Sequence, residues 1–292
     1  MQARVFGSVL VVAFSLIPLF IGGPVFTLFM VVLGIAGYRE YLQLVARVGR
    51  IGTGPHARVG YGVVGAWGLA ALIDATTFSL LLIAVLSVVS PLIVLLLRPL
   101  QPGGFSQWCF ASTGSLYLGL PIYAAVATRS RPGTVDAHWL SEAARRLSLD
   151  WDPTPRGLAW VLTVILAIWA GDSVALFAGR AIGKRKLAPI ISPNKSQEGA
   201  IAGLLAAMVV GAVSFEGFGL GDWKLGLIAG AVVGVAGQLG DLGESVLKRQ
   251  AGVKDSGSVI PGHGGVLDRI DALLFAFPAG FLMAVGLERL GA

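Results

Sequence analysis

Residues Asp241–Asp271 read DLGESVLKRQAGVKDSGSVIPGHGGVLDRID, and this stretch decides how the whole chain is interpreted. It is rich in ionisable residues, and the segments on both sides of it are apolar and long enough to cross a bilayer. Charged side chains beside the hydrocarbon layer are costly, so they are usually retained for a function. The stretch is therefore a candidate functional site. The alternative is a solvated loop of paired charges next to the membrane.

The spacing within this stretch predicts helix, loop and helix. Residues 252–265 are rich in glycine and should form a loop. Asp268 and Asp271 follow at i and i+3, on one side of the next helix. Carboxylates from two helix ends, with lysine and arginine around them, suit Mg²⁺ and a polyphosphate. Before the loop, four polar residues at i, i+3, i+4 and i+7 share one helix face: Asp241, Glu244, Ser245 and Lys248.

The same polar residues resemble the signature of the phosphatidate cytidylyltransferases, or CDP-diacylglycerol synthases. An upstream segment resembles that family as well, and the specific resemblance covers residues 160–280, whereas the N-terminal half matches only in being apolar. The signature positions are filled by Ser245-x-Leu247-Lys248-Arg249, Lys254-Asp255 and Pro261-x-His263-Gly264-Gly265-x-x-Asp268-Arg269-x-Asp271. The upstream positions are filled by Gly171-Asp172, Gly179-Arg180, Gly183-Lys184, Lys186-Leu187, Ser192-Pro193, Lys195 and Glu198-Gly199.

Composition places the chain in a membrane. Of its 292 residues, 55% are hydrophobic and 13% are charged, and the mean hydropathy is +0.79. Soluble domains have about 45–50% apolar and about 25% charged residues. We therefore predict an all-α, polytopic integral membrane protein of about nine transmembrane helices, with a polar site at the cytoplasmic face. The single cysteine, Cys109, excludes an intrachain disulfide and a cysteine-based zinc site.

Nine apolar segments make up this prediction. We divide them into an N-terminal region, residues 1–156, with five spans and a polar connection, and a catalytic C-terminal region, residues 157–292. An amphipathic surface helix is expected over Val135–Leu149. Gly226-x-x-x-Gly230-x-x-x-Gly234 predicts a smooth face for close helix packing. The predicted spans are 5–21, 25–45, 59–73, 78–97, 108–127, 157–178, 199–215, 224–241 and 271–288.

Two nucleotide-binding patterns are rejected, and one pair of charges is left with two interpretations. Gly60-x-Gly62-x-x-Gly65 fits the dinucleotide pattern, but no strand precedes it, so it indicates helix packing. The segment Gly179–Lys184 is one residue too short for a phosphate loop, and Arg185 follows in place of Ser or Thr. Arg39 and Glu40, near the end of the second span, are interpreted as an ion pair at the interface. The alternative is that they face the site.

The resemblance implies that CTP and phosphatidic acid react to give CDP-diacylglycerol and pyrophosphate. The expected cofactor is Mg²⁺, with two metal ions and the identity of the second unknown. The expected metal ligands are Asp241 and Asp268, helped by Glu244, with Asp172 and Asp271 as further candidates. The resemblance also implies catalytic roles for Asp241, Asp268, Lys248, Arg249 and His263. Substrate contacts are expected from Lys186, Ser192, Lys195, Ser245, Lys254 and Arg269.

The net charge of +6 is interpreted through topology. In a soluble protein it would suggest nucleic acid, but here the cations lie mainly in loops 46–58, 98–107, 179–198 and 242–270, so no nucleic acid partner is expected. Loop 128–156 is the exception, with arginines balanced by acids. The positive-inside rule then puts both charged motifs in the cytoplasm. The expected location is the bacterial plasma membrane, in which the protein would be multi-pass. The expected partners are CTP, phosphatidic acid, membrane lipids and a second copy in a homodimer.

Two alternative functions remain open at this stage. The first is another CTP-dependent lipid enzyme, such as a polyprenol kinase or a CDP-archaeol synthase, because these share polytopic architecture and anionic substrates. The second is a non-enzymatic transporter, which should carry charges in the centres of several spans or show an inverted repeat. The complete signature favours the cytidylyltransferase over both.

Overall fold

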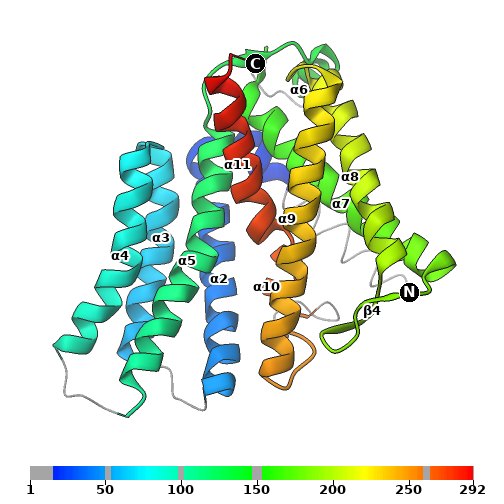
Figure 1. Cartoon of the computed structure of the whole chain (residues 1–292). Coiled ribbons are helices and arrows are strands. Elements are labelled where there is room, and N and C mark those ends of the chain that lie inside the picture. The colour runs from blue at the N-terminus through cyan, green and yellow to red at the C-terminus, as the bar shows by residue number, and fades with distance from the viewer. Residues whose placement is uncertain (1–15, 50–53, 98–101, 147–152, 259–263, 292) are drawn as a thin grey trace. The chain divides into compact units, whose positions relative to one another are not determined.

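The computed structural model describes residues 16–49, 54–97, 102–146, 153–258 and 264–291. These residues form long helices joined by short connections, with two small two-stranded sheets (Figure 1). The predicted all-α, polytopic class is confirmed. The long helices are α2 (Gly23–Gly49), α3 (Pro55–Ile73), α4 (Thr77–Leu96), α5 (Gly104–Arg129), α7 (Arg156–Ile182), α8 (Gln197–Phe218), α9 (Trp223–Gln250) and α11 (Leu273–Arg289).

The number of spans differs from the prediction in a specific way. Within the described residues, seven helical segments are long and apolar enough to cross a membrane: α2, α4, α5, α7, α8, α9 and Leu267–Arg289. The predicted third span corresponds to a shorter apolar helix, Ala57–Ile73. The predicted first span, 5–21, lies mostly outside the described residues. The total of nine therefore stays a prediction.

The chain forms two compact units, and each is described by itself. The first unit contains Met1–Ala127 and Leu247–Ile270, and the second contains Thr128–Val246 and Asp271–Ala292. The predicted division after residue 156 was based on where the motifs fall. It is a statement about function, which these contact-based units do not test.

In the first unit, α3 lies between α2 and α4. Trp67 is fully buried in its core, and the indole N–H of this residue donates to the buried Ser87 hydroxyl at 3.0 Å. The absence of a side chain at Gly119 makes room for this ring, because a Cβ there would overlap it. Gly60 lies inside α3 and faces the Tyr38 ring in the same manner. The glycine pattern around Gly60 is therefore part of a packed helix, as predicted.

In the second unit, α7 and α8 lie side by side and form the most extensive helix contact (Figure 1). Helix α9 approaches α8 through the predicted glycine face. A Cβ at Gly226 would lie 2.5 Å from the Gly211 carbonyl oxygen, and one at Gly234 would lie 2.9 Å from the Ala207 Cβ. Between membrane helices the hydrophobic effect gives little driving force, so close backbone approach of this kind is what stabilises the pair. The prediction from the glycine spacing is confirmed.

The polar segment before α7 also folds. Strands β1 (Thr134–Val135) and β2 (Thr154–Pro155) pair antiparallel, and the amphipathic helix α6 (His138–Arg146) lies between them in sequence. This helix falls inside the predicted Val135–Leu149 and buries Leu140 and Ala144. Arg131 forms an ion pair with Glu288, which ties the segment to α11.

Candidate active site

The upstream charged segment forms a hairpin in the second unit. Strand β3 (Lys186–Ala188) pairs antiparallel with β4 (Ser192–Ser196), directly after α7 and before α8. The Glu198 carboxylate, in the first turn of α8, accepts hydrogen bonds from the backbone N–H groups of Lys184 at 3.1 Å and Arg185 at 3.2 Å. The turn is thus held by a carboxylate, and it follows a helix where a phosphate loop would follow a strand. The rejection of a phosphate loop agrees with this geometry.

The hairpin brings a lysine to an aspartate of α9. The Lys195 ammonium lies 2.5 Å from Asp241 Oδ2, and the two side chains keep 30% and 28% of their surface exposed. Ser245, one turn further along α9, donates to Asp241 Oδ1 at 3.5 Å. Asp172 on α7 lies close enough for the charges of Asp241 and Lys195 to act on it. We call Asp172, Lys195, Asp241 and Ser245 the Asp241 cluster. It contains two carboxylates, an ammonium and a hydroxyl, all within the second unit.

Glu244 belongs to the same helix but to a different environment. Helix α9 is continuous from Asp241 to Lys248, so the predicted spacing on one helix face is confirmed. Within the second unit, however, the Glu244 side chain is fully buried, whereas Asp241 is partly exposed. Sequence spacing alone does not reveal this difference in burial between two carboxylates on neighbouring turns.

The signature forms a second cluster, within the first unit. The Lys248 ammonium lies 2.6 Å from Asp268 Oδ1, and these side chains are only 12% and 9% exposed. Asp268 Oδ2 accepts hydrogen bonds from the backbone N–H groups of Ser256 and Gly265, both at 2.8 Å. The Ser256 hydroxyl lies 2.9 Å from the same oxygen. We call Lys248, Ser256, Gly265 and Asp268 the Asp268 cluster. Its carboxylate is held by donors on both oxygens.

One residue of this environment was misassigned from the sequence. Glu40 on α2 is 2% exposed, and it accepts hydrogen bonds from the backbone N–H groups of Val266 at 3.0 Å and Leu267 at 2.8 Å. Arg39 is exposed. The interpretation of Arg39 and Glu40 as an interfacial ion pair is therefore wrong for Glu40, which faces the signature loop. The available signal was an acidic residue inside an apolar span, which usually marks a functional position.

The other predicted residues are placed less specifically. The Arg249 guanidinium donates to the Val253 carbonyl at 3.1 Å, and Lys254 and Arg269 are exposed. Lys186 and Ser192 begin the two hairpin strands. In the second unit, the Asp271 carboxylate accepts a hydrogen bond from the N–H group of Ala272. His263 lies outside the described residues, so its predicted role stays a prediction.

The fit of these residues to a metal ion is partial. Among the residues that the structure describes, no group of three or more His, Cys, Asp or Glu side chains is arranged to hold a metal. Asp172 on α7 and Asp241 on α9 nevertheless supply two carboxylates within the second unit, and such hard oxygen ligands are the type that Mg²⁺ takes. A cation bound to Asp241 would share the carboxylate with the Lys195 ammonium or displace that ammonium. Asp172 and Asp241 are therefore the carboxylates best suited to bind one.

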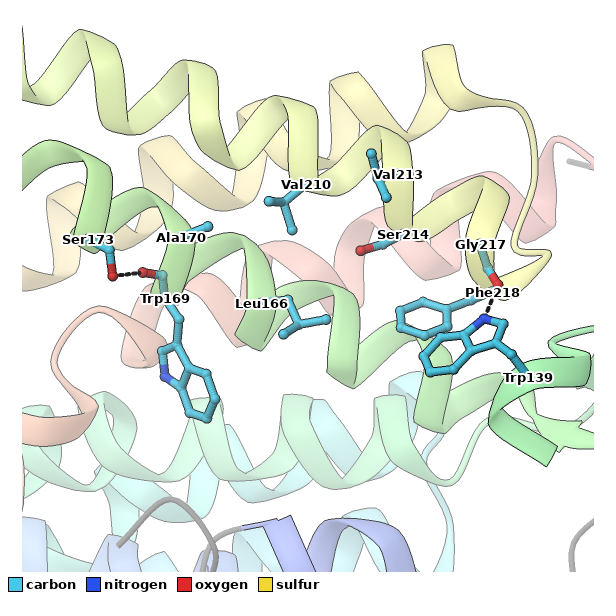
Figure 2. A pocket seen from close by; sticks show the side chains of 10 residues that line it. All are labelled: Trp139, Leu166, Trp169, Ala170, Ser173, Val210, Val213, Ser214, Gly217 and Phe218. Atoms are coloured by element: carbon cyan, nitrogen blue, oxygen red, sulfur yellow. Dashed lines mark hydrogen bonds between the residues drawn. The ribbon is translucent and has the colours of Figure 1, made fainter. Parts of the chain in front are cut away.

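A hollow elsewhere in the second unit lacks the chemistry of an active site. It measures about 650 Å³ and is lined by α6, α7 and α8, with Leu166, Val210 and Phe218 among its apolar side chains (Figure 2). The Trp139 indole N–H donates to the Gly217 carbonyl at 2.8 Å, as Figure 2 shows. No ionisable residue lines it. The hollow is therefore not included in the candidate site.

The fold is that of a polytopic helical membrane protein, and it contains two clusters that each pair a lysine with an aspartate. The chain matches the family described as the cytidylyltransferase family over residues 2–286, and it belongs to that family.

Bacterial relatives named phosphatidate cytidylyltransferase match part of the chain. The protein of Haemophilus influenzae is 54% identical over 128 residues, which are 42% of this chain and 44% of the relative. That of Staphylococcus haemolyticus is 48% identical over 124 residues, 42% of this chain and 47% of the relative. That of Staphylococcus saprophyticus is 45% identical over 130 residues, 44% of this chain and 50% of the relative. The chain thus spans about half the length of the curated relatives it matches.

Proposed function

We propose that this protein transfers the CMP moiety of CTP to phosphatidic acid and releases pyrophosphate, giving CDP-diacylglycerol. The observation that carries the proposal is the pairing of two signature residues, Lys248 and Asp268, at 2.6 Å in a loop held by hydrogen bonds. Membership of the cytidylyltransferase family and the names of the relatives support it.

The chemistry needs no protein nucleophile. A phosphate oxygen of the lipid attacks the α-phosphorus of CTP, a new P–O bond forms, and the bond to the β-phosphate oxygen breaks as pyrophosphate leaves. Such a reaction is accelerated by positioning the reactants and by stabilising negative charge. Lysine side chains bind phosphate as point charges. We assign this role to Lys195 and Lys248, with Lys254, Arg249 and Arg269 as further phosphate contacts.

We also propose that the reaction uses Mg²⁺. Asp241 and Asp172 would hold the ion, since both carboxylates belong to the second unit and Asp241 is partly exposed. Asp268 in the first unit, and separately Glu244 and Asp271 in the second, remain candidate ligands for a further ion. A bound Mg²⁺ supplies positive charge that neutralises phosphate oxygens during the displacement.

The setting of the reaction follows from the membrane helices and the charge asymmetry. We propose a multi-pass protein of the bacterial plasma membrane, with both charged segments on the cytoplasmic side, where CTP is found. We also propose that two copies of the protein form a homodimer in the membrane.

The test is transfer of label from CTP to lipid. The protein, purified in detergent, is incubated with phosphatidic acid and CTP labelled at either the α- or the γ-phosphate, and chloroform-extractable label is counted. Cytidylyl transfer labels lipid only from the α-position. A CTP-dependent kinase acting on a polyprenol would label lipid only from the γ-position, and an archaeal ether-lipid phosphate as acceptor tests for a CDP-archaeol synthase. Absence of lipid label from the α-position would overturn the proposal.

A further inference from the structure

Glu40 is a deeply buried acidic residue of the first unit, and it accepts hydrogen bonds from the signature segment. It lies in α2, where most neighbours are apolar, and it is 2% exposed. A buried carboxylate is retained only when donors compensate its lost hydration. Here every described donor to Glu40 comes from the signature segment, 216 to 227 positions later in the chain.

Each carboxylate oxygen of Glu40 accepts a hydrogen bond from a different backbone N–H group. Oε1 accepts from the Val266 N–H at 3.0 Å, and Oε2 accepts from the Leu267 N–H at 2.8 Å. These N–H groups lie at the start of α10 (Leu267–Ile270), where no intrahelical partner exists for them. Glu40 thus fixes the backbone of the two residues that directly precede Asp268.

Ser256 connects Glu40 to Asp268. Its hydroxyl lies 2.8 Å from Glu40 Oε2 and 2.9 Å from Asp268 Oδ2. The single hydroxyl hydrogen bonds to one of these carboxylates at a time. Because Asp268 also binds the Lys248 ammonium at 2.6 Å, a continuous chain of contacts runs from Glu40 through Ser256 and Asp268 to Lys248.

Two glycines show how closely this chain of contacts is packed. A Cβ at Gly265 would overlap both Glu40 Oε2 and Ser256 Oγ, and one at Gly257 would lie 2.5 Å from Glu40 Oε1. Gly264 has φ +80°, a left-handed conformation that side chains rarely adopt, and its Cβ would lie 2.8 Å from Asp268 Oδ2. The Gly264-Gly265 pair therefore leaves room for the two carboxylates.

We propose that Glu40 is a positioning residue for the cytidylyl transfer, an inference that rests on the proposed function. It acts through Ser256 and the start of α10, and it sets the orientation of Asp268 and hence of Lys248 toward the phosphates of CTP. When a residue that orients a site residue through hydrogen bonds is altered, activity or affinity typically changes by about 10–100-fold. A merely structural role would instead lower stability and leave the kinetics of the folded protein unchanged.

The test compares Glu40→Gln with Arg39→Gln, an exposed neighbour on the same helix. Glutamine keeps the size of the side chain but has only one acceptor oxygen. Its NH₂ group would therefore face the backbone N–H of either Val266 or Leu267, where no hydrogen bond can form. We expect Glu40→Gln to lower kcat/KM for CTP by about 10–100-fold with the KM for phosphatidic acid unchanged. Arg39→Gln should match the wild type. Activity is measured per folded protein, well below the melting temperature of each variant.

Ser256→Ala provides a second variant in case Glu40→Gln does not fold. It removes the link to Asp268 and keeps the Glu40 bonds to Val266 and Leu267, and it should shift the same CTP parameter. The double variant should be no worse than the more impaired single variant, because both break one chain of contacts. The proposal would be overturned if the fold-losses of the two single variants multiplied in the double variant. It would also be overturned if Glu40→Gln were as active as Arg39→Gln. A wild-type protein that makes no labelled lipid would instead overturn the proposed function, and this inference with it.

Discussion

The molecule contains two lysine–aspartate pairs that use the same chemistry in different surroundings. Lys195 and Asp241, in the second unit, keep about 30% of their surface exposed, whereas Lys248 and Asp268, in the first, keep 12% and 9%. Exposed pairs contribute about 0–1 kcal/mol to stability and exchange partners readily. Breaking a buried pair leaves an uncompensated charge and destabilises by about 3–5 kcal/mol. The exposed pair is therefore suited to exchange its ammonium for a ligand, and the buried pair to hold a fixed geometry.

The largest expected effect is that of Asp268→Asn. We expect it to abolish lipid labelling and to destabilise the protein by about 3–5 kcal/mol, because Lys248 loses its buried counter-charge. Thermal unfolding in detergent and the labelling assay measure the two effects. Addition of Lys248→Met should restore much of the stability without restoring activity. An Asp268→Asn protein as stable as the wild type would remove the distinction between the two pairs.

Asp241→Asn is expected to separate activity from stability. Lipid labelling should be lost at low Mg²⁺, while the free energy of unfolding changes by less than about 1 kcal/mol, since the pair is partly exposed. A chelator should abolish wild-type activity, and added Mg²⁺ should restore it. The matched control is Asp222→Asn, an exposed aspartate just before α9. Near-normal turnover of Asp241→Asn in Mg²⁺ would exclude Asp241 as a metal ligand.

Lys248→Ala should act on one substrate more than on the other. A charge-assisted hydrogen bond contributes about 1.5–3 kcal/mol, so we expect kcat/KM for CTP to fall by about 10–100-fold. The KM for phosphatidic acid should change less. Lys224→Ala, an exposed lysine at the start of the same helix, serves as the control. If only the phosphatidic acid parameter changes, Lys248 belongs to the lipid side of the reaction.

The smallest perturbation tests whether both pairs lie on the cytoplasmic side. In a Cys109→Ala background, single cysteines replace Asn194 next to Lys195, Ser258 in the signature loop, and Ala75 as the opposite-side control, all three being exposed. An impermeant maleimide should label only Ala75→Cys in intact cells, and all three after permeabilisation. Labelling of Asn194→Cys but not Ser258→Cys in intact cells would mean that the two pairs do not share one compartment.

Much of this architecture was predictable, because helices in a membrane obey simple constraints. Runs of apolar residues predicted most of the described long helices to within a few residues, although α9 continues to Gln250, beyond the predicted span 224–241. The spacing from Gly226 to Gly234 predicted a helix contact that is present. The dinucleotide pattern was rejected because no strand precedes it, and the phosphate-loop pattern because it is one residue too short and is followed by Arg185. Local composition and spacing carry this information.

The arrangement of the charges was not predictable to the same degree. Spacing placed Asp241 and Glu244 on one face, but their burial depends on which neighbouring helices cover each turn. The role of Glu40 depends on a contact with a segment 226 positions away, and no local pattern reports such a contact. The hairpin that brings Lys195 to Asp241 likewise depends on chain pairing beyond one motif.

The overlap between Gly265 and the Glu40 carboxylate has an evolutionary consequence. A side chain at position 265 is excluded by the acid at position 40 together with the Ser256 hydroxyl, so position 265 is not free to change alone. In related sequences the two should therefore vary together, with glycine required wherever glutamate is present. Where a shorter residue replaces the glutamate, an alanine at position 265 becomes tolerable only if the Ser256 hydroxyl is also absent or displaced.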